Sequence, residues 1–184
     1  MTDRDEESDE SLEALFAATQ SPGDLMAHAY AMESEAAERY AELAEQMALH
    51  NNHGIADVFR DMAGIGQSHA ADMARRASGD VTRHTPWEYH WLDPESPEDV
   101  PVSEVHRAMT PHRALKLALH NEQRAQNFYE LLARRAPSEE VRALAGEFAE
   151  DEREHVAMVR HWLEKYPEPE ADWDDDADEP EETR

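Results

Sequence analysis

The sequence contains no cysteine and almost no lysine, and both shortages limit the kinds of site and partner that the chain can have. Without cysteine it cannot form disulfides, thiolate metal sites or a cysteine nucleophile, so any metal must be bound by His, Asp or Glu. Its two lysines, Lys116 and Lys165, stand among only 17 basic residues, against 43 acidic ones. The net charge of -26 argues against nucleic acid as a partner, because phosphate binding needs a basic face.

Long apolar runs are also lacking. No stretch approaches the length that spans a membrane, and the N-terminus has neither the basic start nor the apolar segment of a signal peptide. We therefore expect a cytoplasmic protein with no membrane partner. The 184 residues are enough for one domain with its own hydrophobic core.

Acidic residues concentrate at the two ends of the chain. Residues 1–13 carry a net charge of -6 and residues 167–184 carry -9, which is more than half of the total. Like-charge blocks of this kind are usually disordered. We expect a mostly disordered acidic tail over 1–20, a folded domain over 21–166 and a disordered acidic tail over 167–184.

Apolar residues between the tails recur every three or four positions, which predicts helices. Ser21-Pro22 and Thr110-Pro111 are typical helix starts. The expected helices span about 21–50, about 55–77, from 110 to the Pro137-Ser138 break, and from there to Pro167, with a short helix around 12–18.

The connections between these helices differ in length. The first and third are short, whereas residues 80–110 contain four prolines and show no helical period. We expect an all-α fold of two helical hairpins joined by a long crossover connection. Its aromatic segment, Trp87 to Trp91, is expected to cover an edge of the bundle or contact a dimer partner.

Five polar residues fall on the apolar stripes: Glu33, His69, Glu122, Glu152 and His155. Residues three, four and seven apart share a helix face, so all five should point inward. Three carboxylates facing one core would repel each other, and their pKa values would rise, unless a cation lies among them. Glu and His are suitable ligands for iron or manganese, so the pattern predicts a metal site.

The two halves of the chain resemble each other. Residues 33–44 align with 122–133 with five identities in twelve positions, and residues 63–71 align with 149–157 without a gap. The second alignment pairs the two inward histidines. The halves look like diverged copies, which would place a metal site near a pseudo-two-fold axis.

In the first half, one helix carries Glu33 and, seven residues later, Tyr40, and the next helix has an inward motif that ends at His69. This pattern resembles the rubrerythrin branch of the ferritin-like superfamily. The second half repeats the pattern with the family's Ala-x-x-Glu-x-x-His motif, which ends at His155. The similarity covers roughly residues 21–165. It implies a ferritin-like four-helix bundle and a non-haem di-iron site, with iron cycling between ferrous and ferric states.

The resemblance also implies roles for individual residues. Glu33 and His69 would bind one iron, Glu122 and His155 the other, and Glu152 would bridge the two. The implied function is an iron-binding oxidoreductase that reacts ferrous iron with dioxygen or hydrogen peroxide. Manganese or another divalent metal is an alternative to iron.

Tyr40 and Tyr129 occupy matching positions in the two halves. Hydrogen bonds from their hydroxyls to the ligand carboxylates would orient those ligands. Plain packing in the core is an equally open interpretation. His50 and His53 lie in or beside a loop and are expected to be exposed.

The sequence departs from the family pattern at Gly66, where the second bridging Glu would stand. The further Glu that rubrerythrins place one turn after the ligand at 122 is replaced by Ala125, and the four-cysteine rubredoxin module is absent. Gly66 therefore marks either a specialised site or a decayed one.

These departures leave two alternatives to the oxidoreductase. One is a single-metal binding protein without oxidase activity, and the other is a structural or regulatory helical bundle with a degenerate site. Expected partners are metal ions and dioxygen or hydrogen peroxide, and a homodimer is the expected assembly because dimers are the commonest symmetric oligomer.

Overall fold

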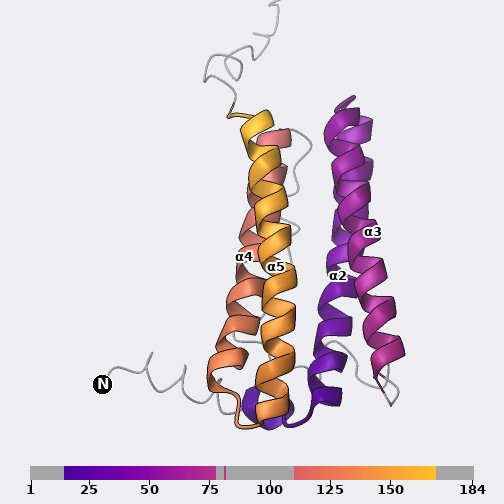
Figure 1. Ribbon diagram of the computed structural model, residues 1–184. Coiled ribbons are helices and arrows are strands. Elements are labelled where there is room, and N and C mark those ends of the chain that lie inside the picture. Colours follow the sequence, from indigo (N-terminus) through magenta and orange to yellow (C-terminus); the bar gives the residue numbers. More distant parts are fainter. Residues whose placement is uncertain (1–14, 78–80, 82–109, 169–184) are drawn as a thin grey trace, which may run out of the picture.

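The computed structural model describes residues 15–77, 81 and 110–168, and this part of the chain forms helices without strands (Figure 1). Four long helices account for most of it: α2 (Pro22–Leu49), α3 (His53–Arg76), α4 (Pro111–Arg135) and α5 (Glu139–Lys165). Residues 15–18 form a short helical turn before α2, within the span expected for a short helix. The predicted all-α bundle is confirmed.

The helices pair as two antiparallel hairpins that lie side by side (Figure 1). Helices α2 and α3 form one hairpin, and α4 and α5 form the other. The crossover expected over 80–110 lies outside the described residues except at Val81 and Thr110. The aromatic segment and the greater part of both expected tails also lie outside them and stay predictions. None of the described helices combines the length and apolarity needed to cross a membrane.

Side-chain caps fix where the helices begin. At α2, the Ser21 hydroxyl accepts a hydrogen bond from the Asp24 amide at 3.2 Å, and the Asp24 carboxylate accepts one from the Ser21 amide at 2.9 Å. At α4 the Thr110 hydroxyl accepts from the Arg113 amide, and at α5 the Ser138 hydroxyl accepts from the Val141 amide. Each such cap contributes about 1 kcal/mol, because it satisfies an amide that has no partner within the helix. The starts of α2, α4 and α5 thus follow the sequence signals.

The turn between α2 and α3 is tighter than the sequence pattern indicates. Asn51 has a φ of 59°, a left-handed conformation that Asn tolerates better than most residues, and the Asn52 amide donates to Met47 O at 2.8 Å. Helix α3 therefore begins at His53, two residues before the expected start at Ile55. His50 and His53 are both exposed, as expected.

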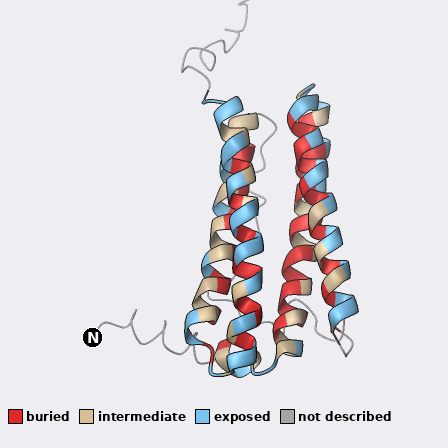
Figure 2. Ribbon diagram, viewed as in Figure 1, coloured by how far each residue is buried: buried red, intermediate tan, exposed pale blue. Residues whose placement is uncertain are grey.

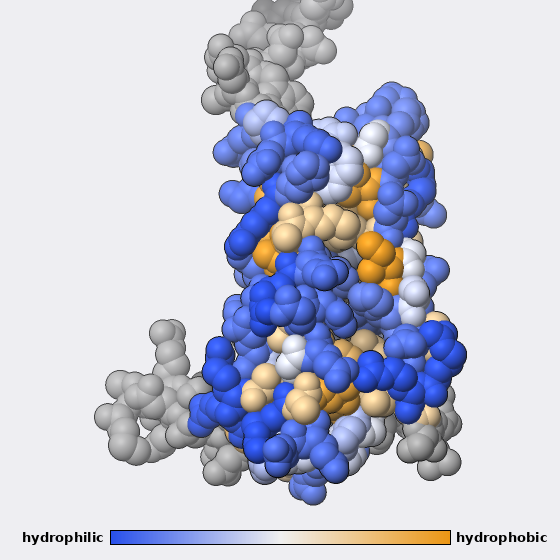
Figure 3. All heavy atoms as spheres, in the orientation of Figure 1, coloured by the Kyte–Doolittle hydropathy of each residue, from blue (hydrophilic) through white to orange (hydrophobic). Residues whose placement is uncertain are grey.

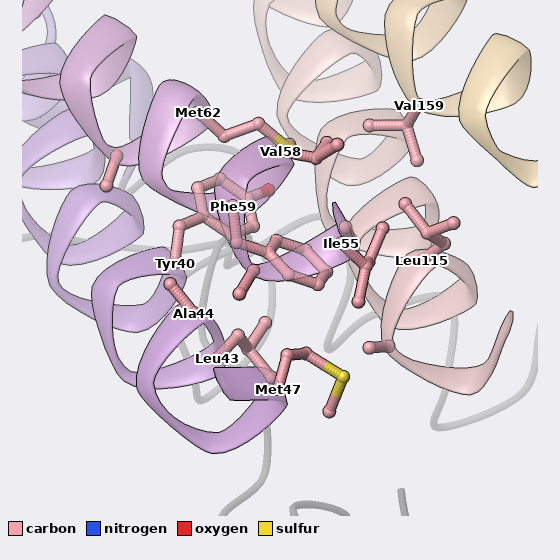
Figure 4. Close-up of a cluster of buried hydrophobic side chains, with 14 of the residues drawn as sticks. Tyr40, Leu43, Ala44, Met47, Ile55, Val58, Phe59, Met62, Leu115 and Val159 are labelled. Carbon is pink, nitrogen blue, oxygen red and sulfur yellow. The ribbon is translucent and has the colours of Figure 1, made fainter. Parts of the chain in front are cut away.

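Two apolar clusters fill the bundle, one toward each end, and buried residues line the facing sides of the hairpins (Figure 2). The first, which we call the Phe59 cluster, joins the C-terminal half of α2 to α3, α4 and α5 (Figure 4). The second, the Phe128 cluster, joins the N-terminal half of α2 to the C-terminal half of α4 and to α5. Each large side chain buried in these clusters contributes about 1.5–3 kcal/mol.

Candidate metal centre

The five residues predicted as ligands lie between the two apolar clusters, and they come from all four helices. Glu33 on α2, Glu122 on α4 and Glu152 on α5 are buried, with exposed fractions of 7%, 3% and 4%. His69 on α3 and His155 on α5 are partly buried, and their side chains are 31% and 13% exposed. Helical spacing placed each residue on the inward face of its own helix, and the packing of the hairpins brings them together.

Glu122, Glu152 and His155 form the most compact part of the centre. His155 Nδ1 lies 3.2 Å from Glu122 Oε2 and 3.2 Å from Glu152 Oε2. One donor atom from each of the three residues lies within 4.8 Å of the others. Three such donors around one point are a geometry that a divalent cation can occupy.

Glu33 and His69 form a second group beside the first. Glu33 Oε1 lies 3.0 Å from His69 Nδ1, so the carboxylate of α2 is paired with the histidine of α3. The His69 and His155 rings stack at 5.2 Å between centroids, with 17° between their planes. The structure therefore pairs Glu33 with His69 and Glu122 with His155, and each pair lies within one hairpin. That they bind metal stays a prediction.

The two equivalent tyrosines differ in their contacts. The Tyr40 hydroxyl donates to Glu122 Oε1 at 2.5 Å, which links α2 in one hairpin to α4 in the other. The Tyr129 hydroxyl lies 3.6 Å from Met32 Sδ, within the Phe128 cluster. Tyr40 is thus in a position to orient a ligand carboxylate, whereas a bond from Tyr129 to a carboxylate stays a prediction.

Burial and mutual hydrogen bonds shift the pKa values of these groups. Burial raises the pKa of Glu152 well above its usual value, against the opposing hydrogen bond with His155. Burial would raise the pKa of Glu122 too, but hydrogen bonds from His155, Tyr40 and Glu152 lower it overall.

The histidines shift in the opposite direction from what burial alone would cause. Burial would lower the pKa of His155, but its hydrogen bonds with Glu122 and Glu152 raise the value to about 11. The hydrogen bond with Glu33 raises the pKa of His69. Without metal, the proton on His155 thus compensates part of the buried negative charge.

The donor set suits iron or manganese, because carboxylate oxygen and imidazole nitrogen are ligands that both metals accept. The ion pairs found for the three carboxylates are with the two histidines, whose protons a metal ion would replace. Glu122, Glu152 and His155 could hold one divalent ion. Glu33 and His69 could hold a second if Glu152 is shared, although Gly66 supplies no fourth carboxylate. The residues present therefore fit the metal centre that the sequence predicts, with one ligand short.

A small pocket that is partly open to solvent adjoins the centre. Apolar side chains from α3 and α5, namely Met62, Ile65 and Met158, line it together with the carboxylates. Ile65 and Met158 were missed as site residues in the sequence. Ile65 lies four residues before His69 and Met158 lies three after His155, so the spacing rule that placed the ligands could have found both.

The Rubrerythrin family model matches residues 24–86 and 113–183. The crystal structure of an uncharacterized conserved protein from Magnetospirillum magnetotacticum is similar, with 38% sequence identity and a TM-score of 0.67. The match covers 82% of this chain and 98% of that one. No curated protein matches.

Proposed function

Because the chain belongs to the rubrerythrin family, we propose that it binds iron at the five-residue centre and oxidises ferrous iron with dioxygen or hydrogen peroxide. The gathering of three buried carboxylates and two histidines between apolar clusters supports this function. Carboxylates buried at this depth strongly disfavour the ionised state unless a cation lies among them.

Iron bound here would supply the electrons: two ferrous ions with two protons would reduce one hydrogen peroxide to two waters, or one dioxygen to hydrogen peroxide. The chain's own residues control protons and position. His155 carries a proton in the metal-free protein and must release it when metal binds, and the raised pKa of Glu152 makes that carboxyl hold its proton to higher pH. Tyr40 holds the Glu122 carboxylate in place through its hydrogen bond. Apolar side chains from α3 and α5 line the pocket beside the centre.

The electrons that return ferric iron to the ferrous state need a separate donor. The 184 residues contain no cysteine, so they cannot form a thiolate-bound iron site for electron transfer. The proposed cycle therefore depends on an outside reductant, and a first assay should supply ferrous iron itself.

The test is ferrous oxidation by the full-length protein, monitored by absorbance after anaerobic loading, with either oxidant. Iron per chain is measured at saturating ferrous iron by equilibrium dialysis. We expect close to two ions per chain and an oxidation rate well above that of free ferrous iron. Glu152→Gln should abolish most of this rate. Glu154→Gln is the matched control, because it makes the same change on the exposed face of α5.

A single-metal binding protein without oxidase activity is the second candidate. It is favoured by the compactness of the Glu122, Glu152 and His155 group, whose donor atoms lie within 4.8 Å of one another. Loading with one ion per chain, and no oxidation above the Glu152→Gln background, would replace the first proposal with this one. A protein that binds no metal would leave a structural or regulatory role.

A further inference from the structure

The candidate ligands divide into two unequal groups. Glu122, Glu152 and His155 are the better enclosed, and His155 contacts both carboxylates at 3.2 Å. Glu33 and His69 offer two donors, and the His69 side chain is 31% exposed. A metal ion at the second group would have fewer protein ligands and a more open path to solvent.

At Gly66 the backbone of α3 lies close against α2. A Cβ built on Gly66 would lie 3.1 Å from Glu33 O, 3.3 Å from Ala37 Cβ and 3.4 Å from Glu33 Oε2. The first two distances are shorter than ordinary van der Waals contact, so even an alanine would push against α2. The Glu33 carboxylate thus lies directly against the space that a side chain at position 66 would need.

That close approach explains how Glu33 pairs with His69. Gly66 and His69 are three residues apart, so they share the face of α3 that packs on α2. Since no side chain intervenes at position 66, the Glu33 carboxylate can lie along this face and reach His69 Nδ1 at 3.0 Å. With glycine at position 66, the centre lacks the carboxylate expected there, and the Glu33 carboxylate has room to reach His69.

We propose that the centre binds two divalent metal ions unequally, and that Gly66 is a positioning residue for the weaker position. The tighter ion is held by Glu122, Glu152 and His155. The weaker, faster-exchanging ion is held by Glu33 and His69, whose pairing depends on the absence of a side chain at position 66. This inference rests on the proposed function only in requiring that the centre bind divalent metal.

Charge supports the same inequality. Three carboxylates in the centre meet the +4 charge of two divalent ions, and two of these carboxylates belong to the group around His155. The second ion is left with Glu33 and a share of Glu152. Substitution of residues that only support the metal ligands already weakens metal binding by roughly 10- to 100-fold. A position that lacks a ligand should therefore bind its ion at least about 10-fold more weakly than the complete position.

The test is a titration of the full-length metal-free protein with Co²⁺, monitored by its visible absorption and by calorimetry. Co²⁺ is not oxidised under these conditions, so binding is measured apart from any oxidase activity. Wild type should show two steps that differ at least about 10-fold in affinity. After saturation, a competing chelator should remove one ion much faster than the other.

Gly66→Ala should weaken the second step by roughly 10- to 100-fold and leave the first unchanged. Gly64→Ala is the matched control, because it makes the same change on the same helix and its Cβ would meet nothing within 4 Å. Both substitutions raise helix propensity equally, so a difference between them isolates the contact with α2. Equal titrations for the two variants would overturn the role of Gly66.

A second pair of variants keeps the test decisive if Gly66→Ala does not fold. Glu33→Gln should remove the second step alone, whereas Glu38→Gln, on the exposed face of α2, should leave both steps intact. Two equal steps in wild type, a single step, or a second step that survives Glu33→Gln would overturn unequal binding. Unequal steps without ferrous oxidation would leave this inference standing and contradict the proposed oxidase.

Discussion

At the scale of single residues, the centre is organised around protons that occupy the place of a cation. The pKa of His155, raised to about 11 by its bonds to Glu122 and Glu152, means that its imidazole is protonated in the metal-free protein at neutral pH, and burial raises the pKa of Glu152 as well. The protonated imidazole pairs with the buried Glu122 and Glu152 carboxylates, each at 3.2 Å. Metal binding must therefore release protons, and its affinity must rise with pH.

The stability of the metal-free protein should fall as pH rises. His155 has a folded-state pKa of about 11 against 6.5 when unfolded, so its contribution is complete below pH 6.5 and is lost as pH rises toward 11. The raised pKa of Glu152 acts in the same direction, from its unfolded value of 4.5 upward. Thermal unfolding in the presence of a chelator, between about pH 6 and pH 9, measures this slope.

A variant separates the contribution of the centre to the pH dependence of stability from that of the other titrating groups. Glu152→Gln with His155→Gln should show a flatter pH dependence, whereas His161→Gln, on the exposed face of α5, should match wild type. Equal slopes for all three proteins would contradict the proton assignment. Co²⁺ affinity of wild type should increase over the same pH range, opposite to the trend in metal-free stability.

Tyr40 is the residue whose hydroxyl most directly supports a ligand. Tyr40→Phe leaves Glu122 without a 2.5 Å hydrogen bond in a buried position, which should cost about 1–3 kcal/mol in the metal-free protein. Metal affinity should fall by roughly 10-fold or more, because the carboxylate loses its orientation. Calorimetric titration and chemical denaturation measure the two effects. Tyr166→Phe, eleven residues beyond His155 at the end of α5, should leave metal affinity unchanged.

At the scale of elements, the helix ends are encoded locally. Ser21→Ala should destabilise the protein by about 1 kcal/mol, because the hydroxyl that bonds to the Asp24 amide and carboxylate is lost, while the amide of residue 21 can still donate to Asp24. Ser34→Ala makes the same substitution inside α2, where the serine hydroxyl bonds to Tyr30 O. That change should be neutral or stabilising, since alanine is the better helix former there. Urea denaturation of both variants tests the contrast, and equal effects would contradict it.

The elements also explain which sequence predictions succeeded. The starts at Ser21, Thr110 and Ser138 were predictable because a cap needs only residues within one turn of itself. The start of α3 was predicted two residues late. Nothing in the local pattern required His53 to be helical, and the tight turn at Asn51 decided it.

At the scale of the whole molecule, the centre links the two hairpins. Tyr40 on α2 bonds to Glu122 on α4, the His69 and His155 rings stack between α3 and α5, and Arg76 on α3 pairs with Glu147 on α5 at 3.0 Å. A second metal ion that is bound by Glu33 and His69 and shares Glu152 would have ligands from both hairpins and would strengthen the same junction. Its effect should therefore appear in the stability of the whole bundle.

Metal loading should raise the melting temperature, because an ion that binds only the folded state stabilises it. At a free metal concentration 100 times the dissociation constant, the gain is about 2.7 kcal/mol. Differential scanning calorimetry with and without a chelator measures the shift. His155→Gln should reduce it and His161→Gln should not. A melting temperature that does not respond to chelation would favour the structural or regulatory alternative.

The expected homodimer and the cytoplasmic location stay predictions. Sedimentation of the full-length chain tests the first, since a dimer doubles the 21.0 kDa mass of one chain. Repeating it with the metal-loaded protein would show whether assembly depends on the centre.

The sequence by itself determined the helices, their inward faces and the five candidate ligands, because periodicity and caps act within a single helix. It also indicated the missing carboxylate at Gly66. The tertiary structure alone decided that Tyr40 reaches Glu122 while the Tyr129 hydroxyl lies near Met32, and that a side chain at position 66 would meet Glu33. Such contacts depend on how each helix is rotated and shifted against its neighbours, which the packing of the whole core sets and no local pattern specifies.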